Sequence, residues 1–318
     1  MTPAADVSAP AAPLTGRPRL FTRYAWAVLG WNLLVVLWGA YVRASGSGAG
    51  CGDRWPLCNG EIAPRFPRLA TLIEFVHRAS SGIALIAVLG LLVWSLYAYP
   101  RTHRVRRAAV WSLVFLILEA LLGAGLVLFD YVDKNVSIGR AVYLSMHLVN
   151  TQLLLGALAL TAWFSRRPAS RIHAPMGVVL AALPVAVLIS MTGVIAALAD
   201  TLFPAASLAE GMRQDLVATA NFLVHWRVIH PAVAVAGALF IIWAATGALR
   251  RSGGRTPRRI ALLAALTAVA QLVAGAVNLA LLTPAGMQLL HLFIADLLWI
   301  LLVLLAIEAP EPSRAQTA

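Results

Sequence analysis

Four histidines lie inside apolar stretches of this chain, where ionisable side chains are rare. His77, His147, His230 and His291 each stand near the start of a long hydrophobic run. An ionisable residue inside a membrane-spanning segment is a functional candidate by default. Imidazole is a common ligand of transition metals and of haem iron, so these residues predict metal or haem binding. The competing interpretation for each one is a hydrogen bond between helices.

The two cysteines lie together in a polar stretch, CGDRWPLCNG, at residues 51–60. Cys51 and Cys58 are close enough in sequence to close a small disulfide ring, provided that the stretch faces an oxidising compartment. Two interpretations stay open for such a bridge. It is either a staple that holds the loop, or a redox-active pair that requires an electron partner nearby.

The chain that must position these residues is strongly apolar. Of its 318 residues, 60% are hydrophobic and 12% are charged, which is outside the range of soluble globular proteins. Runs that can cross about 30 Å of hydrocarbon lie at 24–42, 71–97, 107–129, 141–164, 175–199, 223–248, 259–282 and 287–307. Continuous runs of this length are helices, because a helix satisfies its own backbone in lipid. The predicted fold class is all-α, a polytopic membrane protein with eight transmembrane helices.

Arginine-rich segments predict the orientation. They occur in the N-terminal tail and in the loops 101–107, 165–171 and 250–259. The positive-inside rule places these segments and both termini in the cytoplasm of a multi-pass protein of the cell membrane, and loop 43–70 outside. The net charge of +12 is then a topology signal, and we expect no nucleic-acid partner.

An internal repeat divides the chain. The segment 75–94 resembles 228–244 when His77 is laid on His230, and 120–128 resembles 271–279. We therefore expect two pseudo-symmetric four-helix halves at 24–165 and 172–307, with cytoplasmic tails at 1–23 and 308–318. Glycines such as Gly123, Gly125 and Gly275 suit close helix packing.

The repeat also groups the histidines. Each lies near the outer end of an even-numbered span, so all four lie at one depth, and the twofold repeat pairs His77 with His147 and His230 with His291. Two facing imidazoles on different helices are the axial arrangement for a haem in a helical bundle. A zinc site would instead need three or four converging ligands. His225 is a rival to His230, which the repeat favours.

Charged side chains near the proposed ligands are further candidates. Arg78 and Arg227 could bind haem propionates, although interfacial snorkelling explains most outer arginines. Glu119 and Asp296 are buried acids in the third and eighth spans. They belong either to a proton route or, as we favour, to hydrogen bonds between helices.

Four motifs resemble haem A synthase. They are YVRASGSGAGCGDRWPLCNG (41–60), EFVHR (74–78), HLVNTQLLLG (147–156) and MTGVIAALADTLFP (191–204). The resemblance covers nearly the whole chain, and the combination of the first two motifs is specific. It implies an eight-helix bundle with haem b in the C-terminal half and substrate haem O in the N-terminal half. The reaction would oxidise a porphyrin methyl to a formyl group, giving the haem A of terminal oxidases.

The resemblance also implies roles for single residues and partners. Glu74 and His77 carry over as the substrate-side acid and ligand, and His147, His230 and His291 as the remaining ligands. Haem O synthase, cytochrome oxidase assembly components and membrane lipid are the implied partners. Some members carry a second cysteine pair between helices five and six, but 200–222 contains none. This difference argues against a mechanism that requires two disulfides.

Glu74 distinguishes the two halves. On the repeat alignment it falls opposite Arg227, and Arg78 falls opposite Pro231. At three residues before His77 it lies on the same helix face as that ligand. A desolvated carboxylate there can act as a general base or orient a water molecule; the alternative is a helix cap or an arginine partner.

Two other functions use the same residues. A haem-b electron carrier or quinol:disulfide oxidoreductase would also need four histidines and an outer cysteine pair. A non-catalytic protein that handles or transports haem would bind it only transiently.

Overall fold

The computed structural model describes residues 17–65, 67–166 and 177–308, and within these ranges the chain is built of helices. They are α1 (Arg17–Ala44), α2 (Leu69–Ala98), α3 (Arg104–Leu128), α4 (Ile138–Phe164), α5 (Gly177–Leu202), α6 (Leu208–Leu216), α7 (Phe222–Arg227), α8 (Ile229–Arg251), α9 (Arg255–Ala280) and α10 (Ala285–Glu308). With α7 and α8 taken as one interrupted span, eight described segments are long and apolar enough to cross a membrane. The predicted all-α, eight-span fold class is thus confirmed. Most of both predicted tails and of the linker between the halves lies outside the described residues.

The helix ends differ by a few residues from the ends of the apolar runs that predicted them. The run 24–42 becomes Arg17–Ala44, and 259–282 becomes Arg255–Ala280. Both of these helices begin at arginine-rich residues before the apolar run, so hydropathy alone places their starts too late. Helix α6 was not predicted because it is short and polar. It begins at a capping motif, in which Ser207 Oγ accepts a hydrogen bond from the Glu210 backbone N–H at 3.1 Å.

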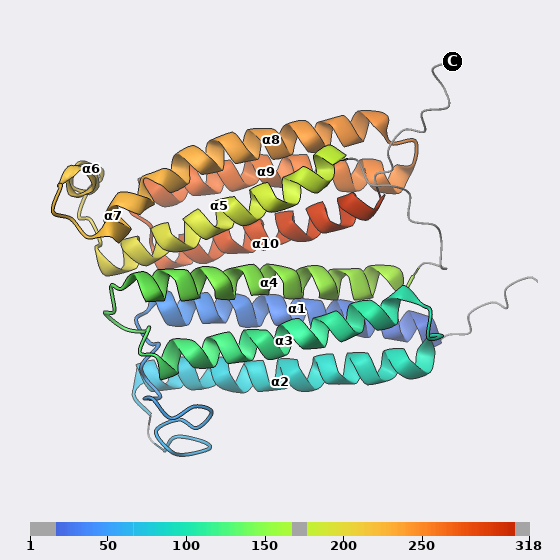
Figure 1. Cartoon of the computed structure of the whole chain (residues 1–318), viewed down its shortest axis with the longest axis horizontal. Helices are drawn as coiled ribbons and strands as arrows, with labels where there is room; N and C mark the ends of the chain where they lie inside the picture. The colour runs from blue at the N-terminus through green and yellow to red at the C-terminus, as the bar shows by residue number, and fades with distance from the viewer. Residues whose placement is uncertain (1–16, 66, 167–176, 309–318) are drawn as a thin grey trace, which may run out of the picture.

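In Figure 1 the long helices lie in two groups, α1–α4 in one and α5 with α8–α10 in the other. Within the first group each helix packs on its neighbours in the closed order α1, α2, α3, α4. The second group repeats this order as α5, α8, α9, α10. The groups meet where α1 and α4 pack against α10 and where α4 packs against α5. The arrangement of contacts therefore makes α1 equivalent to α5, α2 to α8, α3 to α9 and α4 to α10.

The core lies where the two groups meet. In α4, 61% of the most apolar 18-residue stretch is buried inside the protein, against 22% of the corresponding stretches of α2, α3 and α5. Trp299 of α10 donates its indole N–H to the Gln152 carbonyl of α4 at 2.5 Å. Near the end of α1, Arg43 donates to the Ala197 carbonyl and Thr201 hydroxyl of α5, each at 2.8 Å. The same guanidinium donates to Gln288 of α10 at 2.9 Å. One half-buried cation thus ties both groups together.

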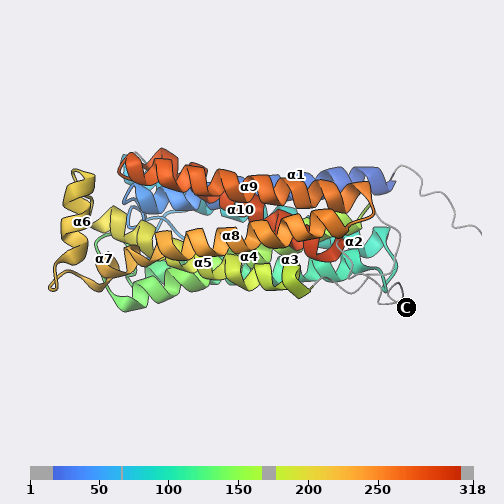
Figure 2. The same cartoon turned by 90° about the horizontal axis from the view of Figure 1, so that it is seen from above.

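The two ends of the bundle differ in character. Helix α1 begins and α10 ends at one end, together with the arginine-rich turns 101–107 and 250–259 (Figures 1 and 2). Residues 45–65 and the short helices α6 and α7 lie at the other end. Large apolar side chains on the outer faces of α2, α3, α8 and α9, such as Ile86, Trp111, Trp243 and Val273, are exposed and suit contact with lipid tails. The fold is that of a multi-pass membrane protein.

Candidate functional site

Each of the four intramembrane histidines lies against a glycine of the preceding long helix. A Cβ atom placed on Gly39 of α1 would stand 2.8 Å from Cε1 of His77. The corresponding distance is 3.0 Å from Gly193 of α5 to His230 and 3.0 Å from Gly275 of α9 to His291. On Gly123 of α3 the Cβ would stand 3.8 Å from Nε2 of His147. Missing side chains thus make room for the imidazole rings in equivalent places of both halves.

In the C-terminal half, His230 of α8 and His291 of α10 face one another. Their ring centroids are 6.4 Å apart and their planes make an angle of 84°. Two imidazoles that bind one metal ion from opposite sides, each at about 2.0 Å, have centroids roughly 6 Å apart. Nδ1 of His230 lies 3.1 Å from the Thr192 hydroxyl of α5. The pair has the separation and the supporting hydrogen bond of axial ligands.

In the N-terminal half, His77 of α2 and His147 of α4 occupy the equivalent helices. Nδ1 of His147 lies 3.2 Å from a carboxylate oxygen of Glu119 on α3, within ion-pair distance but outside hydrogen-bond geometry. Ser81 Oγ donates to the His77 carbonyl at 2.8 Å, a bond inside α2 that leaves the ring unaffected. The ring of His77 is bounded by Gly39 and has no carboxylate of its own among the described residues.

The donor set fits haem iron. Nδ1 of His77, His147 and His291 is buried without an aligned hydrogen-bond partner, so these rings are not held by hydrogen bonds through that nitrogen. No group of three or more His, Cys, Asp or Glu side chains with metal-site geometry occurs among the residues that the structure describes. Imidazoles arranged in pairs, rather than in groups of three or four converging ligands, suit axial ligation of a macrocycle better than a zinc centre.

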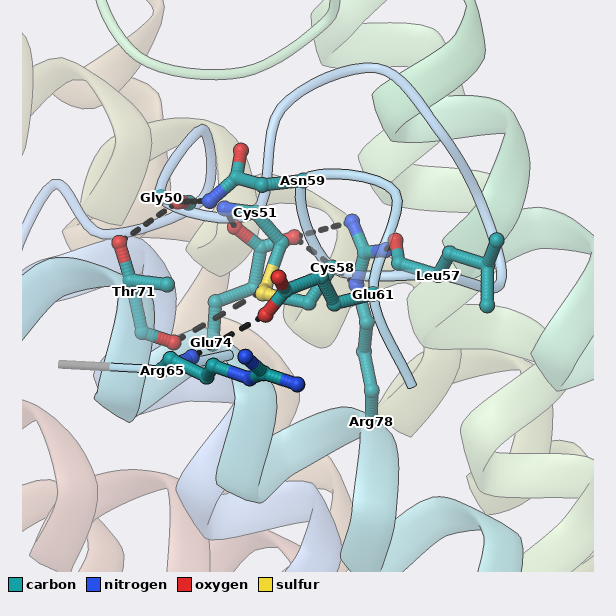
Figure 3. The surroundings of a disulfide bond; sticks show 10 residues. All are labelled: Gly50, Cys51, Leu57, Cys58, Asn59, Glu61, Arg65, Thr71, Glu74 and Arg78. Atoms are coloured by element: carbon teal, nitrogen blue, oxygen red, sulfur yellow. Dashed lines mark hydrogen bonds and ion pairs between the residues drawn. A yellow bond between two sulfur atoms is a disulfide. The ribbon is translucent and has the colours of Figure 1, made fainter. Parts of the chain in front are cut away.

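Cys51 and Cys58 form the predicted disulfide, and both are buried, with 0% and 2% exposure. Figure 3 shows the bridge above the start of α2. The loop packs closely there, because Thr71 Oγ1 donates to the Gly50 carbonyl at 2.8 Å and a Cβ on Gly50 would meet the backbone of α2. The bridge therefore lies directly on the helix that carries His77.

Glu74 connects this loop to α2. It is only 3% exposed, and its Oε2 accepts a hydrogen bond from the Cys51 backbone N–H at 2.8 Å. Its Oε1 accepts from Nε and Nη2 of Arg78 at 3.1 and 2.5 Å, and Arg78 also donates to the Leu57 carbonyl at 2.6 Å (Figure 3). The carboxylate is thus the partner of an arginine, which was the alternative to a role as base. It is also held in one orientation, one turn from His77.

Arg227 lies at the equivalent place in the second half with the opposite charge. Its Nε donates to Asp215 at 2.6 Å, and Nη1 lies 3.5 Å from Asp200. The nearby His225, the alternative to His230 as a ligand, contacts the Val217 carbonyl at 3.0 Å on the exposed side of α7. Among the described residues, His230 rather than His225 is the histidine that faces His291.

The two buried acids differ. Glu119 accepts hydrogen bonds from Asn150 at 2.5 Å and from Thr151, both on α4, which confirms the expected bonding between helices. Asp296 is 3% exposed, yet its Oδ2 has no hydrogen-bond partner among the described residues. The expected interhelical hydrogen bond is therefore missing at that oxygen of Asp296, because no donor from the described part of a neighbouring helix reaches it.

Several site residues escaped prediction. Thr192 and Gln271 touch the rings of His230 and His291, and Gly39 and Gly193 border His77 and His230. The glycine pairs 39/193 and 123/275 recur with nearly the same spacing as His77 and His230 and carry the missing signal. They also shift the predicted register of α3 on α9 by one residue, since Gly123 matches Gly275 rather than Ala274.

Comparisons with known proteins agree with this picture. The chain matches the COX15-CtaA family, described as cytochrome oxidase assembly protein, over residues 22–303. It is 46% identical over 292 residues to a protein of Thermus thermophilus named protoheme IX farnesyltransferase. It is also similar to proteins named heme A synthase from Exiguobacterium sibiricum, 35% identical over 101 residues, and Bacillus licheniformis, 46% identical over 97 residues.

The extent of these matches differs. The Thermus match covers 91% of this chain and 48% of its relative, so the chain spans about half the length of that protein. The two heme A synthase matches cover 32% and 30% of this chain, and 34% and 32% of those relatives. Together with the family match, they confirm the resemblance to haem A synthase that the motifs predicted.

Proposed function

Because the chain belongs to the COX15-CtaA family of cytochrome oxidase assembly proteins, we propose that it converts haem O to haem A by oxidising a porphyrin methyl group to a formyl group. The observation that carries the proposal is an asymmetry between two otherwise matching sites. Both halves place paired imidazoles against glycines, but only the N-terminal half places a fixed carboxylate, Glu74, one turn from a ligand among the described residues.

We assign the resident cofactor, haem b, to His230 and His291, whose rings have the separation of axial ligands. When bound, haem b supplies one-electron redox chemistry. Substrate haem O is assigned to the site between His77 and His147. Arg78 remains our first candidate for a propionate and Arg227 the second, although both guanidiniums donate to protein acceptors in this structure.

The reaction needs a group that accepts protons. Conversion of a methyl group and water to a formyl group releases four electrons and four protons. We propose that the electrons pass to an external one-electron acceptor and that a base beside the reacting carbon accepts the protons. Glu74 suits this role because burial and two fixed donors, the Cys51 N–H and Arg78, hold its oxygens in place. The positive charge of Arg78 balances the Glu74 carboxylate before the carboxylate accepts a proton or while it orients a water molecule.

The proposal also includes an orientation in the membrane and partner proteins. We place the end with the arginine-rich turns in the cytoplasm and the disulfide outside, according to the positive-inside rule. The Thermus relative is named for the transfer of a farnesyl group to protohaem. Such a transfer produces the farnesylated substrate required here, which supports haem O synthase as a partner, beside cytochrome oxidase assembly components.

The test is extraction and typing of the haem bound to the purified full chain. We expect haem b together with haem O or haem A. Glu74→Gln keeps the shape of the side chain but removes the base, so it should bind both haems and accumulate haem O or a hydroxylated intermediate. Haem A formation at the parental rate in this variant would assign Glu74 a purely structural role.

A second function draws on the position of the disulfide. The bridge lies on α2 beside Glu74, where a haem-b protein that exchanges electrons between a quinol and a disulfide would need it. Such a protein would carry haem b alone. Haem typing therefore separates the two functions, and haem O or haem A in the purified chain would reject the electron carrier.

A further inference from the structure

Two equivalent positions beside the histidines carry different side chains. Glu119 of α3 stands four residues before Gly123, and Gln271 of α9 stands four residues before Gly275. Each of these glycines borders a histidine of the following helix, His147 or His291. One turn of helix therefore brings a carboxylate to the first ring and a neutral amide of the same size to the second.

The contacts of the two side chains differ accordingly. Glu119 is held by donors of α4, with Asn150 on Oε2 and Thr151 on Oε1, and Oε1 is the oxygen that lies 3.2 Å from Nδ1 of His147. In the other half, the amide nitrogen of Gln271 lies 3.1 Å from Nε2 of His291. The amide oxygen of Gln271 is buried without a hydrogen-bond partner among the described residues.

These contacts favour different forms of the two rings. A carboxylate only accepts, so it favours a hydrogen on Nδ1 of His147 and leaves the lone pair on Nε2. An amide nitrogen only donates, so it engages the lone pair of Nε2 on His291. Gln271 must therefore turn away from Nε2 before that nitrogen can bind iron. In either amide orientation, the side chain brings no charge to the ring.

We propose that Glu119 is a positioning residue that orients His147 and strengthens it as a haem ligand, and that Gln271 leaves His291 a weaker ligand. The inference rests on the haem ligands assigned under the proposed function. Carboxylates that bind the second nitrogen of a ligating histidine fix its orientation and raise its basicity. A more basic axial ligand stabilises ferric iron, so the haem between His77 and His147 should have the lower midpoint potential.

The experiment exchanges the two side chains in the full chain, purified in detergent and loaded with protohaem as the probe of both sites. Redox titration followed by absorbance gives the midpoint potentials, and electron paramagnetic resonance of the ferric haems reports the ligand field. His77→Ala and His230→Ala assign each signal to its half. Gln152→Glu is the matched control, because Gln152 is buried and binds Ser190 of α5 rather than a histidine ring.

We expect Glu119→Gln to raise the midpoint potential of the N-terminal haem and to weaken its retention on dilution by about tenfold. Gln271→Glu should lower the potential of the C-terminal haem. Each variant should leave the other haem unchanged, and Gln152→Glu should shift neither potential. Loss of only the N-terminal haem in Glu119→Gln, with the C-terminal haem at full occupancy, also supports the positioning role.

Unchanged potentials and resonance spectra in both Glu119→Gln and Gln271→Glu would overturn the inference, even if protein yields fell. If Glu119→Gln does not fold, Glu119→Asp decides the question, since its shorter carboxylate withdraws from Nδ1 of His147 and an unshifted N-terminal potential would then reject the positioning role. The proposed function fails separately. If the variants shift the midpoint potentials but the parental chain never forms haem A, the proposed reaction is rejected and the ligand assignment stays intact.

Discussion

The half built from α1–α4 and the half built from α5 and α8–α10 hold their histidine rings in the same way but surround them differently. In both, a glycine of the preceding long helix makes room for each ring. Around the first pair stand the acids Glu74 and Glu119, and around the second stand the neutral Thr192 and Gln271. The repeated part is therefore the frame for ligands, whereas Glu74 and Glu119 have no acidic counterpart at the equivalent positions of the second half, which are Arg227 and Gln271.

Charge at one repeated position is even reversed. Glu74 pairs with Arg78 one turn later on the same helix. Arg227 pairs instead with Asp215 of α6 and Asp200 of α5. Each of these groups has an opposite charge beside it, so neither Glu74 nor Arg227 is an isolated charge near lipid. Only the first half thereby keeps a carboxylate at this position near its ligand.

The largest effect is expected from removing ligands one half at a time. His230→Ala or His291→Ala should abolish the haem b signal, because each leaves iron with one axial ligand. His77→Ala or His147→Ala should keep that signal and abolish substrate haem binding and turnover. Absorbance spectra and haem extraction measure both. Equal loss of haem b from all four variants would remove the distinction between the halves.

A smaller effect is expected from adding a methyl group to one of the glycines that border the histidine rings. In Gly39→Ala the new methyl group would stand 2.8 Å from Cε1 of His77, so the ring must move. Overpacking of this kind costs about 1–3 kcal/mol, and we expect roughly tenfold weaker retention of the N-terminal haem. Gly30→Ala is the control on the same helix, since no described atom lies within 4 Å of its added methyl. Equal haem retention in both variants would show that the glycine is not required.

The smallest effect on haem binding is expected from the disulfide, which only the first half has among the described residues. Cys51→Ser with Cys58→Ser opens a short loop and should destabilise the protein by about 2–3 kcal/mol, measured by thermal unfolding, with both haems retained. Alkylation without reduction should add no mass to the parental chain. If turnover survives in the double variant, the bridge is a staple; if turnover stops while Glu74 and both haems remain in place, the bridge is redox-active.

Much of this protein follows from local sequence. Apolar runs determine eight spans, because an unpaired backbone is too costly in lipid, and the spacing of His77, His147, His230 and His291 places them on corresponding helices. The motif around Cys51 and Cys58 predicted the bridge. Helix ends and α6 were missed, since polar helical residues leave no trace in hydropathy.

What the sequence by itself determined is the number of spans, the set of histidines and the disulfide. Tertiary structure alone decided which side chains meet the rings. The contact of Glu119 with His147 and that of Gln271 with His291 each join residues on different helices, as does the bond from Cys51 to Glu74 across a loop. The physical reason is that such contacts depend on how helices rotate and approach one another. That rotation is set by packing of small residues such as Gly39 and Gly193 against large rings, over distances that no local pattern records.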